Sequence, residues 1–588
     1  MAKVSVMKKP KDARGTLRKL LSYLSSYRRI LFLIAVLCVI ANVLALLGPS
    51  LAGSAINEAA AGAGQVNFQR VFYYAERMLF CYLISSLLTL AINLIMMHVS
   101  KQVGRKMRGD VFDKLMRLPV GYFDQNPAGD IISRVSYDID VVCTCLATDV
   151  TQILTSVVTV VGSFCMMLVI SPSLSVVVLV TIPISVGYTV YMRGKTQPRY
   201  RKRSAQYGVM NGFVEEKLTG QKTIQAYAYE GMIGDAFDRV NRDAADAYYD
   251  AEYYGVSIGP TMGCINNISL GLISMLGCVL YMAGNVTLGQ ISSFVLYSRK
   301  FSGPINEIAN IINELFSALA AVERVFKLLE EEEETADRPQ AQTLTEVRGD
   351  VKLSHVSFGY DPERRILHDL TLQADAGKLI AIVGPTGAGK TTIINLLMRF
   401  YDVDEGEILV DGRDIRDYTR ASLRSAYAMV LQDTWLFRGT IFENIAYGKE
   451  NATQEEVEAA ARAAHIHPFI MRLPQGYQTV ISEDGGNISK GQKQLLTIAQ
   501  AMLYDCRMLI LDEATSNVDT GTEQEIQDAM RALMRDKTCF VIAHRLSTIR
   551  NADRILVVDG GDVVEQGTHE SLMAKKDFYY RLYHAQFE

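Results

Sequence analysis

The chain has 588 residues, which is enough for several domains and excludes a single small module. Hydrophobic residues make up 49% and charged residues 21%, a mixture too apolar for an ordinary soluble enzyme and too charged for a purely membrane-embedded bundle. The formal net charge of −4 provides no general basic field, so we expect no nucleic-acid partner. The composition predicts one membrane part and one soluble part.

Long runs without a charged side chain dominate the first half of the chain. A helix crosses the hydrocarbon core of a membrane with about 20 residues. Four runs have this length, and the run from Tyr253 to Ser298 is long enough for a fifth span and the start of a sixth, because residues 284–289 carry a turn signal. The six predicted spans lie near residues 30–48, 72–98, 148–170, 174–192, 257–283 and 290–315.

Basic residues are concentrated in the segments that six spans would place on one side of the membrane. Residues 1–29 carry 9 basic side chains, residues 101–140 carry 7 and residues 193–252 carry 10, whereas the opposite loops carry only Arg70 and Arg77. Lys and Arg mark the cytoplasmic side of membrane proteins. We therefore expect a multi-pass protein of the cytoplasmic membrane with both termini in the cytoplasm.

Helical segments are also predicted outside the spans. Residues 16–27 have the pattern of an amphipathic helix that lies on the membrane surface. The long connections between spans two and three and between spans four and five are charged and poor in Pro and Gly. They should continue the spans into the cytoplasm as helical rods.

The sixth predicted span differs from the others because polar side chains interrupt its apolar face around Pro304. Arg299 and Lys300 lie within this span. Charged residues at membrane depth face a cavity or a partner rather than lipid. Arg299 and Lys300 are therefore candidates for the substrate cavity, and a structural or lipid-interface role is the alternative.

The boundary between the two parts is visible in the composition. A transmembrane domain is predicted over residues 1–328. Five consecutive glutamates, residues 330–334, begin a polar stretch that indicates a solvated linker over residues 329–348. A soluble domain is predicted over residues 349–588.

The soluble part contains a glycine-rich motif between a predicted strand, residues 378–383, and a predicted helix, residues 392–400. The motif consists of Gly384, Pro385, Thr386, Gly387, Ala388, Gly389, Lys390 and Thr391, followed by Thr392. In such a loop, backbone N–H groups hold phosphates, Lys390 reaches the terminal phosphate oxygens and the Thr391 hydroxyl ligates Mg²⁺. The motif predicts an α/β P-loop domain that binds ATP and Mg²⁺.

Two later strands of the same domain end in side chains suited to hydrolysis. Residues 508–511 form an apolar run that ends in Asp512 and Glu513. This position suits a carboxylate, Asp512, that holds Mg²⁺ and a neighbour, Glu513, that polarises the attacking water. A third apolar run ends in His544, where a strand tip would approach the γ-phosphate.

In this order, the motifs resemble those of ATP-binding cassette exporters of the half-transporter type over nearly the whole chain. The resemblance implies that Tyr360 stacks on adenine, that Gln432 senses Mg²⁺ and the membrane domain, and that His544 is the switch histidine. Further matching positions are Asp519, the coupling segments within residues 118–134 and 215–226, and Tyr297 with Pro304 in the sixth span. The implied fold is a six-helix transmembrane domain with long cytoplasmic helical extensions, fused to a P-loop nucleotide-binding domain.

The resemblance also implies that the chain works with a second half-transporter. Two cassettes close on two ATP molecules, and each ATP lies between the P-loop of one chain and the signature of the other. The signature positions are Ser489, Lys490, Gly491 and Gln492. Closure would move the coupling segments and switch the spans from inward to outward access.

The signature departs from the usual LSGGQ because Lys490 occupies its third position. A tolerated side chain pointing away from nucleotide is one interpretation, since Gly491 is retained. The favoured interpretation is a heterodimer in which this chain keeps the catalytic glutamate and its partner carries the regular signature. A homodimer is the alternative.

The predicted function is ATP-driven export of amphipathic substrates. A soluble repair ATPase with the same motifs would lack six spans. An ATP-gated channel is the remaining alternative, although Glu513 and His544 favour repeated hydrolysis. About 29 residues precede the first span, which argues against a leader-processing peptide exporter, but drugs, lipids and small peptides stay open as substrates.

Overall fold

The computed structural model describes residues 12–60, 62, 65–361, 363–431, 434–482, 487–512, 520–543 and 546–587. Within these ranges, the side chains of residues 13, 305–310, 312–313, 520, 546–547 and 586–587 are not described. The chain divides into two compact units. The first unit contains Met1–Leu118 and Gln125–Glu333, and the second contains Pro119–Asp124 and Glu334–Glu588.

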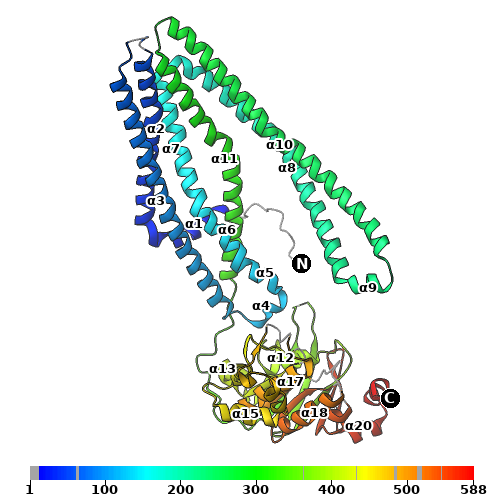
Figure 1. Ribbon diagram of the computed structural model, residues 1–588. Coiled ribbons are helices and arrows are strands. Elements are labelled where there is room, and N and C mark those ends of the chain that lie inside the picture. The colour runs from blue at the N-terminus through cyan, green and yellow to red at the C-terminus, as the bar shows by residue number, and fades with distance from the viewer. Residues whose placement is uncertain are drawn as a thin grey trace. The chain divides into compact units, whose positions relative to one another are not determined.

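The first unit is helical (Figure 1). Its helices are α1 (Ala13–Leu24), α2 (Arg28–Ala59), α3 (Phe68–Leu115), α5 (Ala128–Ser133), α6 (Ile139–Thr144), α7 (Val150–Ile170), α8 (Pro172–Thr219), α9 (Gln221–Ala226), α10 (Glu230–Met282) and α11 (Leu288–Leu329). A 3₁₀ turn covers Ser25–Tyr27, and π-helical turns cover Arg134–Asp138 and Cys145–Asp149. Helix α4 (Val120–Gln125) begins among the residues assigned to the second unit.

Helices α2, α3, α7 and α11 pack against one another, and α8 pairs with α10 along its length (Figure 1). Five helical segments are long and apolar enough to cross a membrane: Arg14–Ala59, Phe68–Leu115, Ala128–Ile170, Pro172–Thr219 and Glu230–Met282. The sixth predicted span lies within α11, which is long but is not among these five. The predicted turn is confirmed, since α10 ends at Met282 and α11 begins at Leu288.

The predicted extensions are also confirmed as helices. Helix α3 continues to Leu115, α8 continues to Thr219, and α10 begins at Glu230, well before the predicted fifth span. The expected amphipathic helix is α1, although it runs from Ala13 to Leu24 and ends in a 3₁₀ turn.

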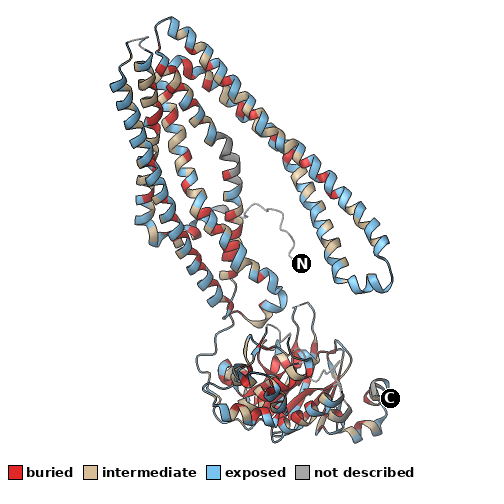
Figure 2. Cartoon of the chain, viewed as in Figure 1, coloured by how far each residue is buried: buried red, intermediate tan, exposed pale blue. Residues whose placement is uncertain are grey.

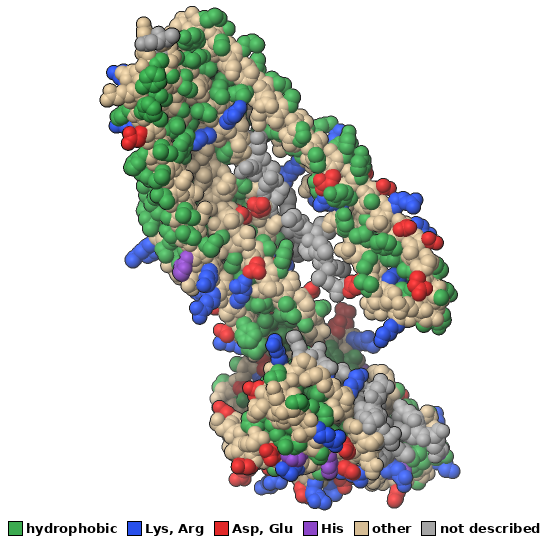
Figure 3. All heavy atoms as spheres, in the orientation of Figure 1, with side chains coloured by type: hydrophobic (Ala, Val, Ile, Leu, Met, Phe, Trp, Pro, Cys, Tyr) green, Lys and Arg blue, Asp and Glu red, His purple; other side chains and the backbone are tan. Residues whose placement is uncertain are grey.

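Much of the first unit's helical surface is exposed (Figure 2), and hydrophobic side chains cover large parts of it, with charged side chains elsewhere along the same helices (Figure 3). Phe32 is 73% exposed, Phe80 63% and Val190 65%. Contiguous apolar surface of this kind is unfavourable in water and is typical of a membrane-embedded protein. Inside the unit, α2 and α11 approach so closely that a Cβ added to Gly289 would lie only 1.9 Å from the carbonyl oxygen of Gly53.

The second unit is an α/β domain with two sheets. Its strands are β1 (Val351–Phe358), β2 (Leu367–Ala374), β3 (Leu379–Val383), β4 (Glu405–Val410), β5 (Arg413–Asp414), β6 (Tyr427–Val430), β7 (Gly439–Thr440), β8 (Val480–Ile481), β9 (Met508–Asp512), β10 (Thr538–Ile542), β11 (Arg554–Asp559) and β12 (Asp562–Gly567). Its remaining helices are α12 (Lys390–Leu397), α13 (Arg420–Ser425), α14 (Ile441–Ala446), α15 (Gln454–Ala463), α16 (His467–Arg472), α17 (Lys490–Tyr504), α18 (Thr520–Met534), α19 (Leu546–Arg550), α20 (His569–Lys575) and α21 (Phe578–Phe587), with 3₁₀ turns at Ile415–Asp417 and Gly476–Gln478.

The larger sheet has the order β12-β11-β3-β10-β9-β6, and its strands from β11 to β6 are parallel. The smaller sheet is antiparallel and has the order β2-β1-β4-β5. Strands β9, β10 and β11 are buried on both faces, which explains why they read as continuous apolar runs rather than alternating ones. Two clusters of buried apolar residues pack against the larger sheet. They fix the position of the strands whose ends carry the predicted site.

Candidate functional site

The predicted site residues follow parallel strands of one sheet. Strand β3 ends at Val383 and leads into the glycine-rich loop, and β9 ends at Asp512. Because these strands are parallel to β10 between them, their carboxyl ends meet at one edge, as do those of β10 and β6. Gln432, Glu513 and His544 follow β6, β9 and β10 in the sequence but lie outside the described residues, as does Asp519. Ligands of open α/β sheets bind at this edge.

The loop between β3 and α12 requires glycine at three positions. Gly387 and Gly389 have φ values of 83° and 100°, which disfavour a side chain. A Cβ on Gly384 would lie 2.0 Å from the carbonyl oxygen of Val558. The conformation of the loop therefore depends on glycine at these positions. Helix α12 begins directly after the last of them, at Lys390.

Lys390 closes this loop from inside. Its Nζ donates hydrogen bonds to the carbonyl oxygens of Gly384, at 2.7 Å, and Pro385, at 2.9 Å. Burial lowers the pKa of Lys390, and the nearby Asp512 carboxylate opposes that shift. The Lys390 ammonium therefore lies close to the loop backbone and to the carboxylate at the end of β9. A bound phosphate would offer it stronger acceptors than the two carbonyl oxygens.

The two threonines at the start of α12 have different surroundings. The Thr391 side chain is exposed, so its hydroxyl is accessible to an ion. Thr392 is 5% exposed, and its Oγ1 accepts a hydrogen bond from the Tyr360 hydroxyl at 3.3 Å. Asn395 donates to the same Tyr360 oxygen at 3.1 Å, so that helix α12 fixes the position of this tyrosine.

Tyr360 is 42% exposed and lies next to the loop helix. The rings of Phe358 and Tyr401 contact it edge to face, with centroids 5.1 Å and 5.0 Å away. These contacts leave part of the Tyr360 ring available for stacking.

Tyr401 is a residue that the sequence analysis missed. Its hydroxyl donates to Asp124 at 2.5 Å, within the second unit, and a Cβ on Gly121 would lie 3.0 Å from its ring. Burial, together with the hydrogen bond to Asp124, raises the pKa of Tyr401. Tyr401 therefore contacts both Tyr360 and the short segment Pro119–Asp124. An aromatic pair directly after a P-loop helix is the signal that could have drawn attention to it.

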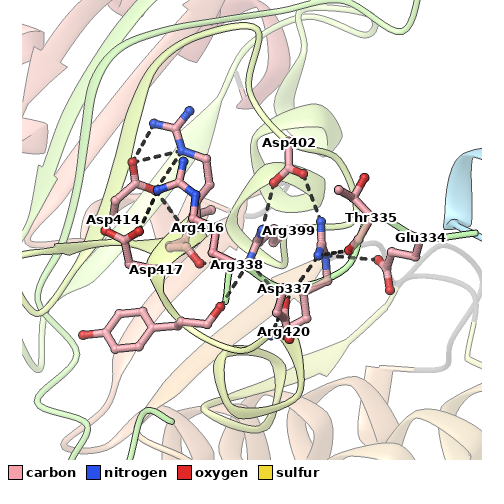
Figure 4. A network of polar contacts seen from close by, with 12 residues as sticks. Glu334, Thr335, Asp337, Arg338, Arg399, Asp402, Asp414, Arg416, Asp417 and Arg420 are labelled. Carbon is pink, nitrogen blue, oxygen red and sulfur yellow. Dashed lines mark hydrogen bonds and ion pairs between the residues drawn. The ribbon is translucent and has the colours of Figure 1, made fainter. Parts of the chain in front are cut away.

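An arginine network follows the carboxyl end of α12 (Figure 4). Arg420 is 7% exposed and pairs with Asp337 at 3.3 Å and Asp402 at 3.0 Å. Arg399 pairs with Asp402 at 2.9 Å. We call this group of charged residues, together with Glu334 and Arg424, the linker network.

Arg424 connects the linker network to α12. It pairs with Glu334 and donates to the carbonyl oxygens of Met398, at 3.3 Å, and Arg399, at 2.9 Å. Within the predicted solvated linker, Glu334 and Asp337 are half-buried and paired with arginines. Arg420 lies within 4.0 Å of both carboxylates. Because Arg420 is far from them in the sequence, the composition of the linker does not reveal this pairing.

The signature residues begin a second helix, α17. Ser489 Oγ accepts the N–H of Gln492 at 3.3 Å, and Gln492 Oε1 accepts the N–H of Ser489 at 3.0 Å. This reciprocal arrangement is a capping box. Lys490 is exposed in the first turn, whereas Gly491 is buried. The Ser489 hydroxyl keeps its own proton available for donation.

The two candidates for the substrate cavity, Arg299 and Lys300, differ in their exposure. Arg299 is exposed, whereas Lys300 is half-buried within the first unit. Lys300 Nζ donates to the carbonyl oxygen of Ala45 at 2.9 Å and lies 5.6 Å from the centroid of the Tyr82 ring. Tyr297, one turn earlier, donates to the carbonyl oxygen of Leu46 at 2.5 Å. Lys300 and Tyr297 thus join α11 to α2, and the cavity role of Arg299 and Lys300 stays a prediction.

Comparison with known proteins matches both halves of the chain. Residues 31–305 match the family described as ABC transporter transmembrane region, and residues 367–516 match the family described as ABC transporter. An uncharacterized ABC transporter ATP-binding protein of Bacillus subtilis (strain 168), YfiC, is 42% identical over 580 residues, which cover 99% of this chain and 96% of that protein.

Two further similarities agree with these matches. A fatty acid ABC transporter ATP-binding/permease protein of Mycobacterium bovis is 45% identical over 478 residues, covering 81% of this chain and 75% of that protein. The solved structure of a bacterial Atm1-family ABC exporter with ATP bound has a TM-score of 0.76 and 30% identity, covering 96% of this chain and 98% of the other. The predicted fold, a transmembrane helical domain fused to a P-loop domain, is thereby confirmed.

Proposed function

Since the chain belongs to the ABC transporter family and is an ATPase coupled to membrane transport, we propose that it is one half of an exporter that moves an amphipathic substrate across the cytoplasmic membrane. Export would proceed by alternating access, with ATP hydrolysed between two cassettes. The observation that carries the proposal is the junction of β3, a glycine loop and α12 in a chain that also has five membrane-length apolar helices.

In this proposal the loop residues 384–389 and the first turn of α12 bind the phosphates of ATP. The N–H groups at the helix start face the phosphates, and Lys390 exchanges its two carbonyl partners for phosphate oxygens. Tyr360 stacks on the adenine ring. Its fixed hydroxyl and partly exposed ring suit that role.

The donor set also suits Mg²⁺, which prefers oxygen ligands. Thr391 offers an exposed hydroxyl and Asp512 a carboxylate at the end of β9, and Gln432 would contribute from the end of β6. When bound, the ion neutralises charge on the phosphates. Glu513 would polarise the attacking water, and His544 would contact the γ-phosphate. These roles follow from the position of each residue after its strand.

Exporter half-transporters dimerise, and we propose that this chain pairs with a different half-transporter. Ser489, Lys490, Gly491 and Gln492 would contact the ATP held by the partner. The support for a heterodimer is the exposed Lys490 in the first turn of α17, where the usual signature has glycine. A homodimer is the alternative.

We further propose that both termini and residues 349–588 lie in the cytoplasm, with residues 1–328 as the transmembrane domain and residues 329–348 as the linker. The concentration of basic residues in the predicted cytoplasmic segments supports this orientation. For the substrate we propose a lipid-like amphiphile, because a relative 45% identical over 478 residues is named for fatty acids. A multidrug substrate is a second candidate.

The test is transport in proteoliposomes. The purified chain, alone and with candidate partner chains, is reconstituted with a labelled fatty acid or a cationic drug, and ATP-dependent movement across the bilayer is measured. Transport that stops in the Glu513→Gln variant would support the proposal. Ion conductance that is gated by ATP, without movement of any amphiphile, would contradict export and favour a channel.

A further inference from the structure

The linker network fixes residues 334–337 by contacts that lie within the second unit (Figure 4). Glu334 accepts a hydrogen bond from Arg424 at 3.2 Å, and the Asp337 carboxylate lies 3.3 Å from the Arg420 guanidinium. The same Asp337 carboxylate accepts the backbone N–H of Arg420 at 3.2 Å, at the start of α13. Both linker carboxylates therefore have fixed partners.

Two arginines of the network also hold the carboxyl end of α12. Arg424 donates to the carbonyl oxygens of Met398, at 3.3 Å, and Arg399, at 2.9 Å. Arg399 has a φ of 51°, a left-handed conformation that an arginine rarely adopts. Its buried side chain donates to the carbonyl oxygens of Ile415, at 3.2 Å, and Tyr418, at 3.1 Å. Because such a conformation persists only where its surroundings fix it, these contacts hold the end of α12 in place.

Helix α12 connects this end to the loop that is proposed to bind phosphate. It has 8 residues and is about 12 Å long at 1.5 Å per residue. Its side chains Ile393, Ile394 and Leu397 are buried in an apolar core, and Lys390 is its first residue. A short helix packed in this way moves as one body, so a displacement of its carboxyl end also displaces Lys390.

The linker is also anchored on the side of α11. Helix α11 ends at Leu329, and Glu333 pairs with Lys114 of the first unit at 3.0 Å. Glu334, the next residue, pairs with Arg424 of the second unit. Consecutive Cα atoms are about 3.8 Å apart, so no free segment lies between the two pairings. A movement at the end of α11 therefore reaches the linker network through the covalent chain.

We propose that Glu334 and Asp337 are positioning residues of the ATP site, because the linker network connects the end of α11 to the P-loop helix α12. The inference rests on the ATP site and the moving spans of the proposed function, and it adds a route outside the coupling segments within residues 118–134 and 215–226. Coupling between two sites is reciprocal. ATP at the start of α12 should therefore stabilise the bound linker, and loss of the linker carboxylates should weaken ATP binding.

Hydrogen exchange of the complete chain in nanodiscs tests this coupling without substrate or transport. The probe is AMP-PNP, a nucleotide that is not hydrolysed, with Mg²⁺. The reporters are the amides of Arg420, which donates to Asp337, and Gln342, which donates to the carbonyl oxygen of Asp417 at 2.8 Å. We expect the nucleotide to slow exchange at these amides about fivefold, the lower end of typical coupling between sites.

The double variant Glu334→Gln, Asp337→Asn removes both linker charges with little change in shape. The nucleotide should no longer slow exchange in the linker, and AMP-PNP should bind about fivefold more weakly, since the coupling acts equally in both directions. The matched control is Glu332→Gln, at an exposed glutamate of the same acidic run outside the linker network, which should change neither quantity.

A double-mutant cycle tests whether the effect passes through one contact. Glu334→Gln and Arg424→Gln each break the pairing between these two side chains, so the combined variant should lose little more nucleotide affinity than either single variant. A purely structural linker would leave its exchange insensitive to nucleotide, whatever its contribution to stability.

Three results would overturn the proposal: linker exchange that does not respond to nucleotide in the unaltered chain, a response that persists in Glu334→Gln, Asp337→Asn, or losses of affinity in the cycle that simply add. Exchange at residues 384–392 separates this inference from the proposed function. Nucleotide that fails to protect those residues would contradict the ATP site at α12, whereas protection there with an unresponsive linker would contradict only the coupling proposed here.

Discussion

The second unit contains two helices whose first turns are predicted to contact nucleotide, and they begin in different ways. Helix α12 follows Gly389, which has a φ of 100°, and no side chain of the described chain caps it. Helix α17 follows Ser489 and carries a complete capping box with Gln492. The start of α12 therefore leaves its N–H groups for a ligand, whereas the start of α17 satisfies two N–H groups with its own side chains.

This difference predicts that the start of α12, and not that of α17, needs a ligand to satisfy its N–H groups. Lys390 closes the loop before α12 through two carbonyl oxygens, and in the proposed function phosphate oxygens replace these partners, so that α12 binds the ATP held by its own chain. The capped start of α17 satisfies these N–H groups without a ligand, and Ser489 is exposed. Such a start suits a surface that meets a nucleotide already bound elsewhere.

The largest expected effect is the loss of ATP hydrolysis when the predicted catalytic base is replaced. Replacing Glu513→Gln should leave ATP binding intact and reduce turnover by about 10²–10⁴-fold, because the base that polarises water is lost. ATPase rates and nucleotide affinity of the assembled complex are the measurements. The control is Glu525→Gln, at an exposed glutamate of α18. Turnover within about twofold of wild type would be far short of this loss and would remove Glu513 from the catalytic role.

The next effect concerns ligand binding at the start of α12. Lys390→Ala removes a charge from the phosphates, and charge-assisted hydrogen bonds of this kind contribute about 1.5–3 kcal/mol. We expect the affinity for ATP to fall about 10–100-fold, measured by equilibrium binding of a labelled nucleotide. Lys352→Ala, at an exposed position of β1, is the control. An unchanged affinity would mean that the loop amides alone hold the phosphates.

A smaller effect is expected at the other end of α12, in the linker network. Arg424→Ala leaves the carbonyl oxygens of Met398 and Arg399 without this donor and releases Glu334. The side chains of Arg424 and Glu334 are each 28% exposed, so we expect a loss of about 1–2 kcal/mol in the unfolding free energy of the second unit. Thermal unfolding checks this. Arg531→Ala, at an exposed arginine paired with Asp528, should cost much less.

Local sequence patterns predicted the parts of the site that lie close together in the chain. The glycine loop, Lys390 and Thr391 form one continuous segment, and Asp512 follows an apolar run, so hydrophobic pattern and motif were sufficient. Even the cap of α17 can be read from Ser489 and Gln492, three residues apart. The same patterns predicted the long helices, because membrane spans and charged rods both lack breaking residues.

Contacts between distant segments could not be predicted in this way. Asp124 and Tyr401 are 277 residues apart, and Glu334 and Arg424 are 90 residues apart. Charges and aromatic rings at such separations have many equivalent partners until the fold selects one. The hydrogen bond from Lys300 to Ala45 was missed for the same reason, since the sequence shows a charge within an apolar segment but not the helix that faces it.

The smallest expected effect tests whether the start of α17 faces a slowly hydrolysed ATP. In a heterodimer, Lys490→Gly changes an exposed side chain at a capped helix start, so turnover of the complex should stay within about twofold, while Ser489 and Gln492 keep the cap. Only the communication between the two sites should change. The measurement is ATPase stimulated by substrate, for the chain alone and for the chain with its partner. Full stimulated turnover by the chain alone, at two equivalent sites, would contradict the heterodimer and make Lys490 a tolerated substitution in a homodimer.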